Sequence, residues 1–493
     1  MISGAQLEIA IVVSALALGV LGDVLLRTFP WGANVALWMV LFVAVVAVLS
    51  RSRREVWAGG GHFLLLPVIL SSCAFLWHDS LALRALNVLA LGVALSLAML
   101  RAQSGHLRTS SLMQYALGSV LAGLNVVLGM PVLLFGNSAW RETLKGAGSR
   151  RLAAVLRGLA FSILPFLVFG GLFIAADAVF QHFAQRLLHF EFTDPVIVIL
   201  LAFAVGGYLR GLLLGKELTT VAQKRPPSLS LGTIEMGIML GLLDLLFLAF
   251  VIVQVQYFFG GSAWVQSTTG LTYAEYARRG FFELVAVAAL LLPFLLLVHW
   301  LLPREDAKAQ RLFRGLAGAQ LILLTVIMVS AFQRLRLYEA QYGLSEQRLY
   351  PTAFLGWLAV VFVWFALTVL RGHRDRFAFG AMVAGFLLIA VLHALNPDAL
   401  IARTNLRRAK AGSPFDAGYA ASLSADAVPD LVAGLPFLNS RDRCRVAVRL
   451  VKRWGPAEHH DWRSWSYSRS RAWQAVRENA PAWQGLTCTD SDH

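Results

Sequence analysis

Charged residues are scarce in this sequence. Asp, Glu, Lys and Arg together make up 14% of the 493 residues, whereas hydrophobic residues make up 58%. Soluble domains carry about a quarter of charged residues, so this scarcity excludes an ordinary soluble globular protein. The net charge of +15 would suit a nucleic-acid-binding protein, but most Lys and Arg lie in breaks between apolar runs. We therefore expect no nucleic acid as a partner.

Cysteine is also rare, since the sequence contains only Cys73, Cys444 and Cys488. None of them has the Cys or His spacing of a zinc site, so the sequence predicts no metal and no cofactor. Cys444 and Cys488 both follow the last apolar run. In an oxidising compartment they could form a disulfide, whereas in the cytoplasm they would stay reduced.

No Lys or Arg precedes the first apolar run, which begins near residue 7. A secretory signal peptide normally carries positive charge before its apolar core, so we interpret this run as an uncleaved membrane span. The triplet Ala15-Leu16-Ala17 leaves a cleaved signal peptide open as the alternative.

Long apolar runs are abundant. A membrane-spanning helix needs about 20 mostly apolar residues, and runs of this kind recur along the chain. We therefore predict an all-α fold, a polytopic helical membrane bundle of about twelve spans with a small C-terminal helical soluble domain. The predicted spans are 7–26, 31–50, 62–78, 81–100, 112–135, 155–180, 195–214, 234–259, 280–302, 312–332, 352–370 and 376–395.

The predicted domains follow these runs. They are N-terminal membrane spans (1–136), a basic polar connector (137–154), a main membrane domain (155–395) and a C-terminal soluble helical domain (396–493). Asn396 and Pro397 begin the last domain as a helix should begin, with a capping residue followed by proline. This domain is small and can build only a small core, so we expect it to dock on the outer loops.

The distribution of basic residues predicts the orientation. Fourteen Lys and Arg lie in loops 136–154, 215–233, 303–314 and 371–376, against six in loops 181–194, 260–279 and 333–351. Positive loops stay in the cytoplasm, so the second set of loops and the tail are predicted outside. Basic residues on both sides of 112–135 contradict this alternation. Either this segment does not span the membrane, or it forms a shallow hairpin with the fourth predicted span, 81–100.

Polar side chains in hydrocarbon are candidates for function because they are costly there. In the span 234–259, Asp244 follows Gly237 and Gly241 on one stripe, and glycines recur at the same spacing in the span 195–214. Small residues at this spacing allow close approach, so we predict that these two spans pack together. The candidate intramembrane polar site consists of Asp244, Arg210, Glu235, Gln254 and Gln256.

Three arrangements are open for Arg210. It could pair with Asp244 across the predicted glycine seam, which would make a centre for proton or ion movement. It could pair with Glu235, which matches its depth better. It could also extend to the membrane surface without any partner.

Tyr and Arg are concentrated in the predicted outer loops 260–279 and 333–351. One interpretation is an outward pocket for an anionic or sugar-like ligand, with Arg donors and aromatic platforms. The other, which we prefer, is a belt of Tyr and Arg at the lipid headgroups. The pocket candidates are Tyr273, Tyr276, Arg278, Arg279, Glu283, Arg336, Tyr342 and Arg348.

Several phrases are similar to those of a known family. They are VQVQYFFGG (253–261), TYAEYARRGFFELVAVA (272–288), RLRLYEAQYGLSEQRLY (334–350), WLAVVFVWFALTVLRG (357–372), NPDALIARTNL (396–406), LSADAVPDL (423–431) and DWRSWSYSRSRA (461–472). In this order they resemble a family of bacterial multi-pass membrane proteins catalogued as a domain of unknown function, over roughly residues 155–475. The resemblance implies an integral protein of the bacterial inner membrane and supplies no activity, substrate or catalytic residue.

Three functions follow from these patterns. Asp244 and its amide-bearing span favour a transporter or ion-coupled membrane protein. The Trp- and Arg-rich tail favours a non-enzymatic envelope protein that signals or scaffolds by binding a protein partner through its outer loops and tail. A lipid-linked transferase would need an acidic pair or a nucleophile and base in an outer loop, and we expect no catalytic residues. The lipid bilayer is the expected partner in each case.

Overall fold

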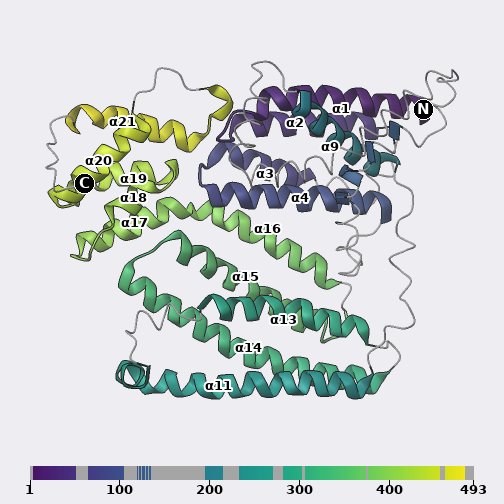
Figure 1. Cartoon of the computed structure of the whole chain (residues 1–493), viewed down its shortest axis with the longest axis vertical. Coiled ribbons are helices and arrows are strands. Elements are labelled where there is room, and N and C mark those ends of the chain that lie inside the picture. Colours follow the sequence, from purple (N-terminus) through teal and green to yellow (C-terminus); the bar gives the residue numbers. More distant parts are fainter. Residues whose placement is uncertain are drawn as a thin grey trace, which may run out of the picture. The chain divides into compact units, whose positions relative to one another are not determined.

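The structure is a computed structural model that describes residues 4–51, 65–104, 195–214, 232–269, 281–302, 306–373, 376–455 and 461–483, with short pieces of 119–134. Throughout these residues the secondary structure is helical, as the sequence predicts (Figure 1). Contacts divide the chain into two compact units. The first holds residues 1–107, 113–223 and 458–470, and the second holds residues 108–112, 224–457 and 471–493.

The first unit is built on the antiparallel pair α1 and α9. A Cβ on Gly19 of α1 would lie 2.7 Å from the Val198 carbonyl oxygen of α9, and one on Gly206 of α9 would lie 3.2 Å from Ala15. Glycine therefore allows the two backbones to approach closely. The helices of this unit are α1 (Gly4–Leu26), α2 (Ala33–Ser50), α3 (Leu65–Trp77), α4 (Leu81–Ser104) and α9 (Pro195–Leu214).

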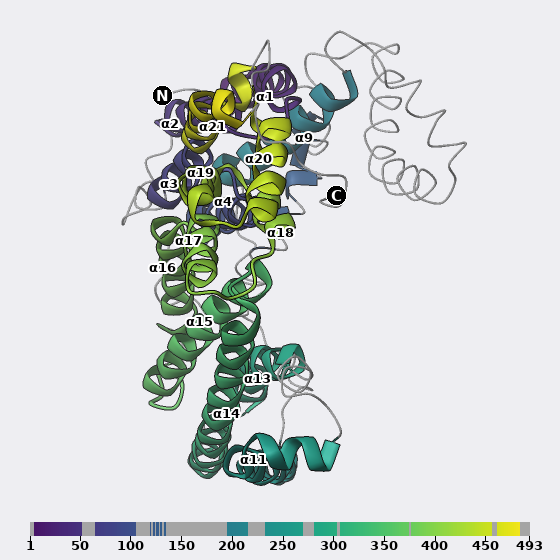
Figure 2. The same ribbon diagram turned by 90° about the vertical axis from the view of Figure 1, so that its left-hand side faces the viewer.

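The second unit contains a row of long apolar helices, of which α14 contacts α11, α13 and α15 (Figure 2). Their core includes Phe313, Leu324 and Phe365, all almost fully buried. The helices of this row are α11 (Thr233–Thr269), α13 (Phe281–Leu301), α14 (Ala307–Tyr342), α15 (Glu346–Thr368) and α16 (Phe377–Leu395).

Nine helices within the described residues are long and apolar enough to cross a membrane. They are the five of the second unit together with α1, α2, α4 and α9. Helix α3 is also apolar, but its 13 residues make it shorter than these nine helices. The predicted span 155–180 lies outside the described residues, and 112–135 is described only in pieces. The chain is therefore a multi-pass helical membrane protein, and the expected number of about twelve spans stays a prediction.

The tail after Asn396 folds into short helices. Asn396 accepts a hydrogen bond from the Ala399 amide and Pro397 begins the helix, as predicted. The elements are α17 (Pro397–Lys410), α18 (Ala417–Ser422), η4 (Ala425–Ala427), α19 (Val428–Gly434), η5 (Leu435–Phe437), α20 (Ser440–Trp454), η6 (Trp462–Ser464) and α21 (Tyr467–Trp483). Their small core is formed by residues such as Ile401, Val446 and Leu450.

The prediction that residues 333–351 form a loop is wrong. Helix α14 continues to Tyr342 and α15 begins at Glu346, so that only three residues connect them. Gly343, with φ of 79°, ends α14 in a conformation that favours glycine.

Contacts with the tail explain this long helical extension. Leu344 and Leu349 pack against the tail core. The Asn405 side chain of α17 accepts a hydrogen bond from the Leu344 amide at 2.9 Å and donates one to the Leu344 carbonyl at 2.8 Å. Arg408 donates to the Ala340 carbonyl at 2.7 Å. The tail therefore docks on the segment 333–351, as predicted.

Candidate functional site

Helices α11 and α14 make the most extensive helix contact of the second unit. At their first turns, the Thr233 hydroxyl donates to the Asp306 carboxylate at 2.9 Å. One turn further along, a Cβ on Gly237 would lie 3.1 Å from Leu312. The two helices therefore run parallel, and residues advance along both at the same rate.

Asp244 lies on the buried face of α11. Met236, Leu240, Phe247 and Val251 are buried at 8% exposure or less, and Asp244 occurs between them at helical spacing. Its residue as a whole is half-buried, but both carboxylate oxygens are buried and have no hydrogen-bond partner among the described residues. An ionised carboxylate without a partner is costly in hydrocarbon, so this position needs an additional bound species or a functional reason.

Gln320 is the corresponding polar residue of α14. It is fully buried, and neither its amide nitrogen nor its amide oxygen has a hydrogen-bond partner among the described residues. Asp244 follows Gly237 by seven residues and Gln320 follows Leu312 by eight. Because Gly237 and Leu312 face each other, Asp244 and Gln320 lie at the same depth to within about one helical turn.

At this depth α11 thus carries a buried acid and α14 a buried amide. A carboxyl group can take up and release a proton, and an amide can donate to it or accept from it. The backbone is less available, because α11 and α14 both continue as helices past this level and the carbonyl groups of a helix are used within it. Sequence analysis missed Gln320, although a glutamine in the middle of the predicted span 312–332 was a usable signal.

Arg210 has a different partner from those predicted. It belongs to α9 in the first unit, where its guanidinium donates to the Asn125 side chain at 3.2 Å. The Glu235 carboxylate accepts a hydrogen bond from the Gly232 amide at the start of α11. None of the three predicted arrangements of Arg210 describes this contact. Gln254 and Gln256 belong to α11, but their side chains lie outside the described residues.

The predicted packing of the spans 195–214 and 234–259 stays a prediction, because the two helices belong to different units. Within each unit, Gly211 and Gly237 face other partners. A Cβ on Gly211 of α9 would lie 2.7 Å from Met99 of α4 and 3.1 Å from Asn125. Gly237 of α11 faces Leu312 of α14. Spacing of small residues thus identified faces that pack closely within each unit.

The predicted outer-loop pocket is described only in part. Arg348 lies over the Tyr338 ring at 4.2 Å and over the Tyr342 ring at 5.8 Å. Arg336 forms an ion pair of 3.6 Å with Glu339 and is otherwise exposed. Arg348 of α15 thus contacts two rings of α14, and Arg336 pairs within α14 itself. The remaining candidates, whose side chains lie outside the described residues, are Tyr273, Tyr276, Arg278, Arg279 and Glu283.

A second buried charged group lies in the first unit, where the links α1–α2 and α3–α4 meet the tail. Asp79 forms ion pairs with Arg84 and with Arg469, and the Arg469–Asp79 distance is 2.5 Å. All three side chains are almost fully buried. Arg469 also donates to the Pro30 carbonyl at 3.1 Å and to the Ser464 carbonyl. Sequence analysis missed this cluster, for which Arg84 inside an apolar run was the available signal.

A third buried acid lies in the tail. Asp398 is 1% exposed, and one of its oxygens has no hydrogen-bond partner among the described residues. The pKa of Asp398 is raised to about 7, mainly by burial and also by the nearby Glu346 and Asp426 carboxylates, whereas hydrogen bonds from Ser424 partly oppose this rise. The Ser424 amide donates at 3.2 Å. At neutral pH this carboxyl group is therefore partly protonated.

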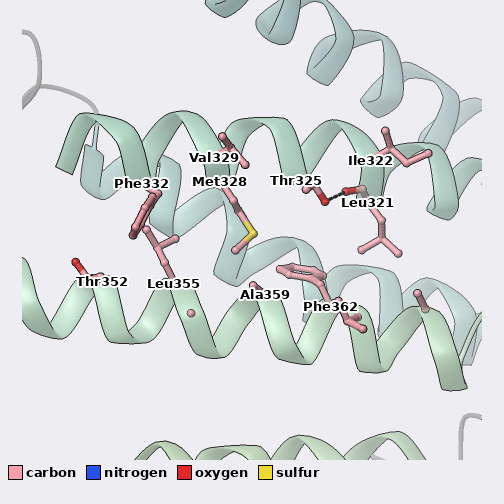
Figure 3. Close-up of a pocket in the computed structure, with 13 residues that line it drawn as sticks. Leu321, Ile322, Thr325, Met328, Val329, Phe332, Thr352, Leu355, Ala359 and Phe362 are labelled. Carbon is pink, nitrogen blue, oxygen red and sulfur yellow. Dashed lines mark hydrogen bonds between the residues drawn. The ribbon is translucent and has the colours of Figure 1, made fainter. Parts of the chain in front are cut away.

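The grooves of the second unit are apolar. One groove of about 410 Å³ lies between α14 and α15 and is lined by residues such as Leu321, Met328 and Phe362 (Figure 3). Its two hydroxyl groups are already used, since Thr325 donates to the Leu321 carbonyl and Thr352 to the Arg348 carbonyl. A groove of about 500 Å³ between α11 and α13 is lined by apolar residues alone. Both suit lipid chains better than a polar substrate.

The apolar helices and their buried polar groups define an integral, multi-pass helical membrane protein. Within this class, the chain belongs to the family described as a domain of unknown function, DUF4153, which residues 65–434 match. This match begins at residue 65, earlier than the resemblance over roughly residues 155–475 that the sequence phrases indicated. It ends at residue 434, within the tail. No curated protein and no solved structure matches the chain.

Proposed function

We propose that this protein is a transporter-like, ion-coupled membrane protein in which Asp244 binds the coupling ion. The supporting observation is that Asp244 and Gln320 keep four buried polar atoms without hydrogen-bond partners among the described residues, at a similar depth on the packed helices α11 and α14. A buried polar group without a partner costs about 1–3 kcal/mol, and a charged one costs more. Apolar residues at these two positions would pack with less cost, so a binding role is the physical reason for an acid and an amide.

The coupling ion that fits these two residues is a proton. A metal cation such as Ca²⁺ requires six to eight oxygen ligands. The two residues supply the two oxygens of Asp244 and the one of Gln320, because the surrounding backbone is helical. A proton needs only the carboxylate, and the neutral acid that it forms is tolerated in hydrocarbon. The Gln320 amide would then hydrogen-bond to the carboxyl group in either protonation state.

We place the protein in the bacterial inner membrane with its tail in the periplasm. The excess of Lys and Arg in alternate loops supports this orientation. Cys444 is disulfide-bonded, and disulfides persist in oxidising compartments such as the periplasm. Cys488, its predicted partner, lies outside the described residues.

The alternative function is a non-enzymatic envelope protein that binds a partner through its tail and outer segments. Two observations favour it. The tail is docked closely on the helix ends through Asn405 and Arg408, and the two grooves described above are apolar. In this case Asp244 would be dispensable, whereas disturbing the tail would abolish function.

A flux measurement tests the proposal. The purified protein is reconstituted into liposomes that contain a pH-sensitive dye, and a potassium diffusion potential drives proton entry. We expect uptake with the wild type and with Asp244→Glu, and no uptake with Asp244→Asn. Gln320→Leu should slow uptake, since it removes only the hydrogen-bond partner.

Thr325→Val is the matched control, because Thr325 is exposed in the groove between α14 and α15 and bonds only to the Leu321 carbonyl of its own helix. It should leave uptake unchanged. Equal uptake by the wild type and Asp244→Asn would contradict the proposal. A cellular phenotype that survives Asp244→Asn but is lost with Arg469→Ala would support the envelope alternative instead.

A further inference from the structure

Exposed aromatic side chains gather at one end of the first unit. They come from the ends of the apolar helices and from the tail segment 461–469, which the structure places beside them (Figure 1). Their exposed fractions are 66% for Phe29, 55% for Trp77, 60% for Trp462, 42% for Trp465 and 49% for Tyr467.

Hydrogen bonds fix the depth of the tail segment. The Trp465 carbonyl accepts from the Ala33 amide at 2.9 Å, at the first residue of α2. The Arg463 guanidinium donates to the Val24 carbonyl at 2.6 Å, in the last turn of α1. The Ser468 hydroxyl donates to the Trp77 carbonyl at 2.9 Å, at the last residue of α3. The segment is therefore held at the level where the apolar helices end.

Buried polar contacts lock the inner side of the same segment. Arg469 is 3% exposed and pairs with Asp79. A Cβ on Gly32 would lie 2.9 Å from the Ser464 carbonyl, which shows how closely the backbones approach. Asp461 accepts three hydrogen bonds from the Arg463 side chain and one from the Thr28 hydroxyl. The aromatic rings of this rigid segment consequently point away from the contact.

The other tryptophans of the tail behave differently. Trp454 is 6% exposed and belongs to the tail core, where Trp473 packs against it with ring centroids 6.4 Å apart. Among the described tryptophans of the tail, the exposed ones are therefore those that lie at the ends of the apolar helices. Trp and Tyr are enriched at this level of membrane proteins because their rings are apolar and their N–H or O–H groups bond to headgroups.

We propose that the segment Asp461–Tyr467 is a lipid anchor of the tail, in which Trp462, Trp465 and Tyr467 enter the headgroup region of the bilayer. The headgroup layer is about 5–8 Å thick on each side of the hydrocarbon, and the hydrogen bonds to Val24, Ala33 and Trp77 keep the segment within it. The anchor is independent of the ion-coupled function, since it rests on residues of the first unit alone.

Spin labelling tests the anchor directly in the full-length protein. Single cysteines replace Trp462, Val448 and Leu81 in a Cys73→Ser background, and they are labelled without reductant so that Cys444 stays disulfide-bonded. The protein is placed in nanodiscs of phosphatidylethanolamine and phosphatidylglycerol. Collisions with oxygen, which concentrates in lipid, are compared with collisions with a water-soluble nickel chelate.

Leu81→Cys is the membrane reference, because Leu81 is 71% exposed at the first residue of α4. Val448→Cys is the aqueous control, because Val448 is 45% exposed on α20 of the tail. We expect the label at 462 to favour oxygen over the chelate several-fold, as at 81, whereas the label at 448 favours the chelate.

Chelate access at 462 equal to that at 448 would overturn the anchor and leave the aromatic rings in water. Low access of both reagents at 462 would also overturn it, because the rings would then be covered by protein, either a second copy of this chain or another partner. The expected results at 81 and 448 show that the protein of the Cys73→Ser background is folded and inserted, and a thermal-unfolding midpoint of the 462 variant equal to theirs shows the same for that variant.

Discussion

The two units differ in whether their buried charged and polar groups have partners. In the first, Asp79 is paired with Arg84 and Arg469, and Arg469 is further bonded to backbone carbonyls. In the second, Asp244 and Gln320 lack hydrogen-bond partners among the described residues. Because its charges are paired, the Asp79 cluster can serve to hold the structure together. Asp244 and Gln320, which lack such partners, can instead bind a ligand or an ion.

The location of each group explains the difference. Asp79 lies in the link between α3 and α4, where the helices end and the tail brings Arg469 and its own carbonyl groups. Asp244 lies within a long helix, where neighbouring backbone groups are bonded within the helix. Free partners are available at helix ends and scarce in the middle of helices. Variants of the two groups should therefore behave differently.

The largest effect is expected for Asp79→Ala. It leaves Arg84 and Arg469 buried without their counter-charge, which costs about 3–5 kcal/mol. Thermal unfolding in detergent and protease cleavage within the tail would measure this loss. Arg403→Ala is the control, since Arg403 is exposed and pairs with Asp430 at the tail surface, and it should cost about 0–1 kcal/mol. Similar effects of the two variants would contradict the structural role of Asp79.

Asn405→Ala should have the next largest effect. It removes both hydrogen bonds to Leu344 and leaves that amide and carbonyl without their partners, at a cost of about 1–3 kcal/mol. Hydrogen exchange of residues 343–346 should accelerate accordingly. Asn479→Ala provides the comparison, because Asn479 bonds only within its own helix. Unchanged exchange in Asn405→Ala would show that apolar packing alone holds the tail on α14 and α15.

The pH dependence of tail docking is expected to change in Asp398→Asn. Folding raises the pKa of Asp398 to about 7, well above its ordinary value. The stabilising effect of its proton is thus complete below about pH 4 and is lost as the pH rises towards 7. Wild-type stability should fall over this range, and the variant should fall less. Parallel pH profiles measured by thermal unfolding would exclude Asp398 as the cause.

The smallest effect on stability is expected for Asp244→Asn. No hydrogen bond among the described residues is lost, and the carboxyl group is replaced by a neutral amide of similar shape that can still bond to Gln320. The change in unfolding free energy should lie within about 1 kcal/mol of zero or favour the variant. Comparison with Asp79→Ala in one thermal-unfolding series would sharpen the contrast between the two units. A large loss of stability in Asp244→Asn would show that Asp244 has a structural partner.

The sequence predicted features that depend on neighbouring residues. Apolar runs identified the spans because length and polarity decide whether a helix can cross a bilayer. Asn396 and Pro397 identified the beginning of α17, since capping is a local interaction. The end of α14 was misplaced, because its extension depends on Asn405, 61 residues away from Leu344.

The sites were less predictable than the fold. Asp244 was recognised because an acid inside an apolar run is conspicuous without any partner. The contact of Arg210 with Asn125 was not predicted, since helical spacing shows which face packs and not what it packs against. The pairing of Asp79 with Arg469 connects residues 390 positions apart. No local pattern contains such information, and only the folded chain brings the two together.

Helix α14 has a mechanical consequence. Its 36 residues form one continuous rod of about 54 Å, with Gln320 near its middle and the acceptor for Arg408, Ala340, near its far end. A rigid rod that tilts at one point must also move at its end. Any rearrangement of α14 at the level of Gln320 would consequently be transmitted to α17, so that the tail is mechanically coupled to the middle of the apolar helices.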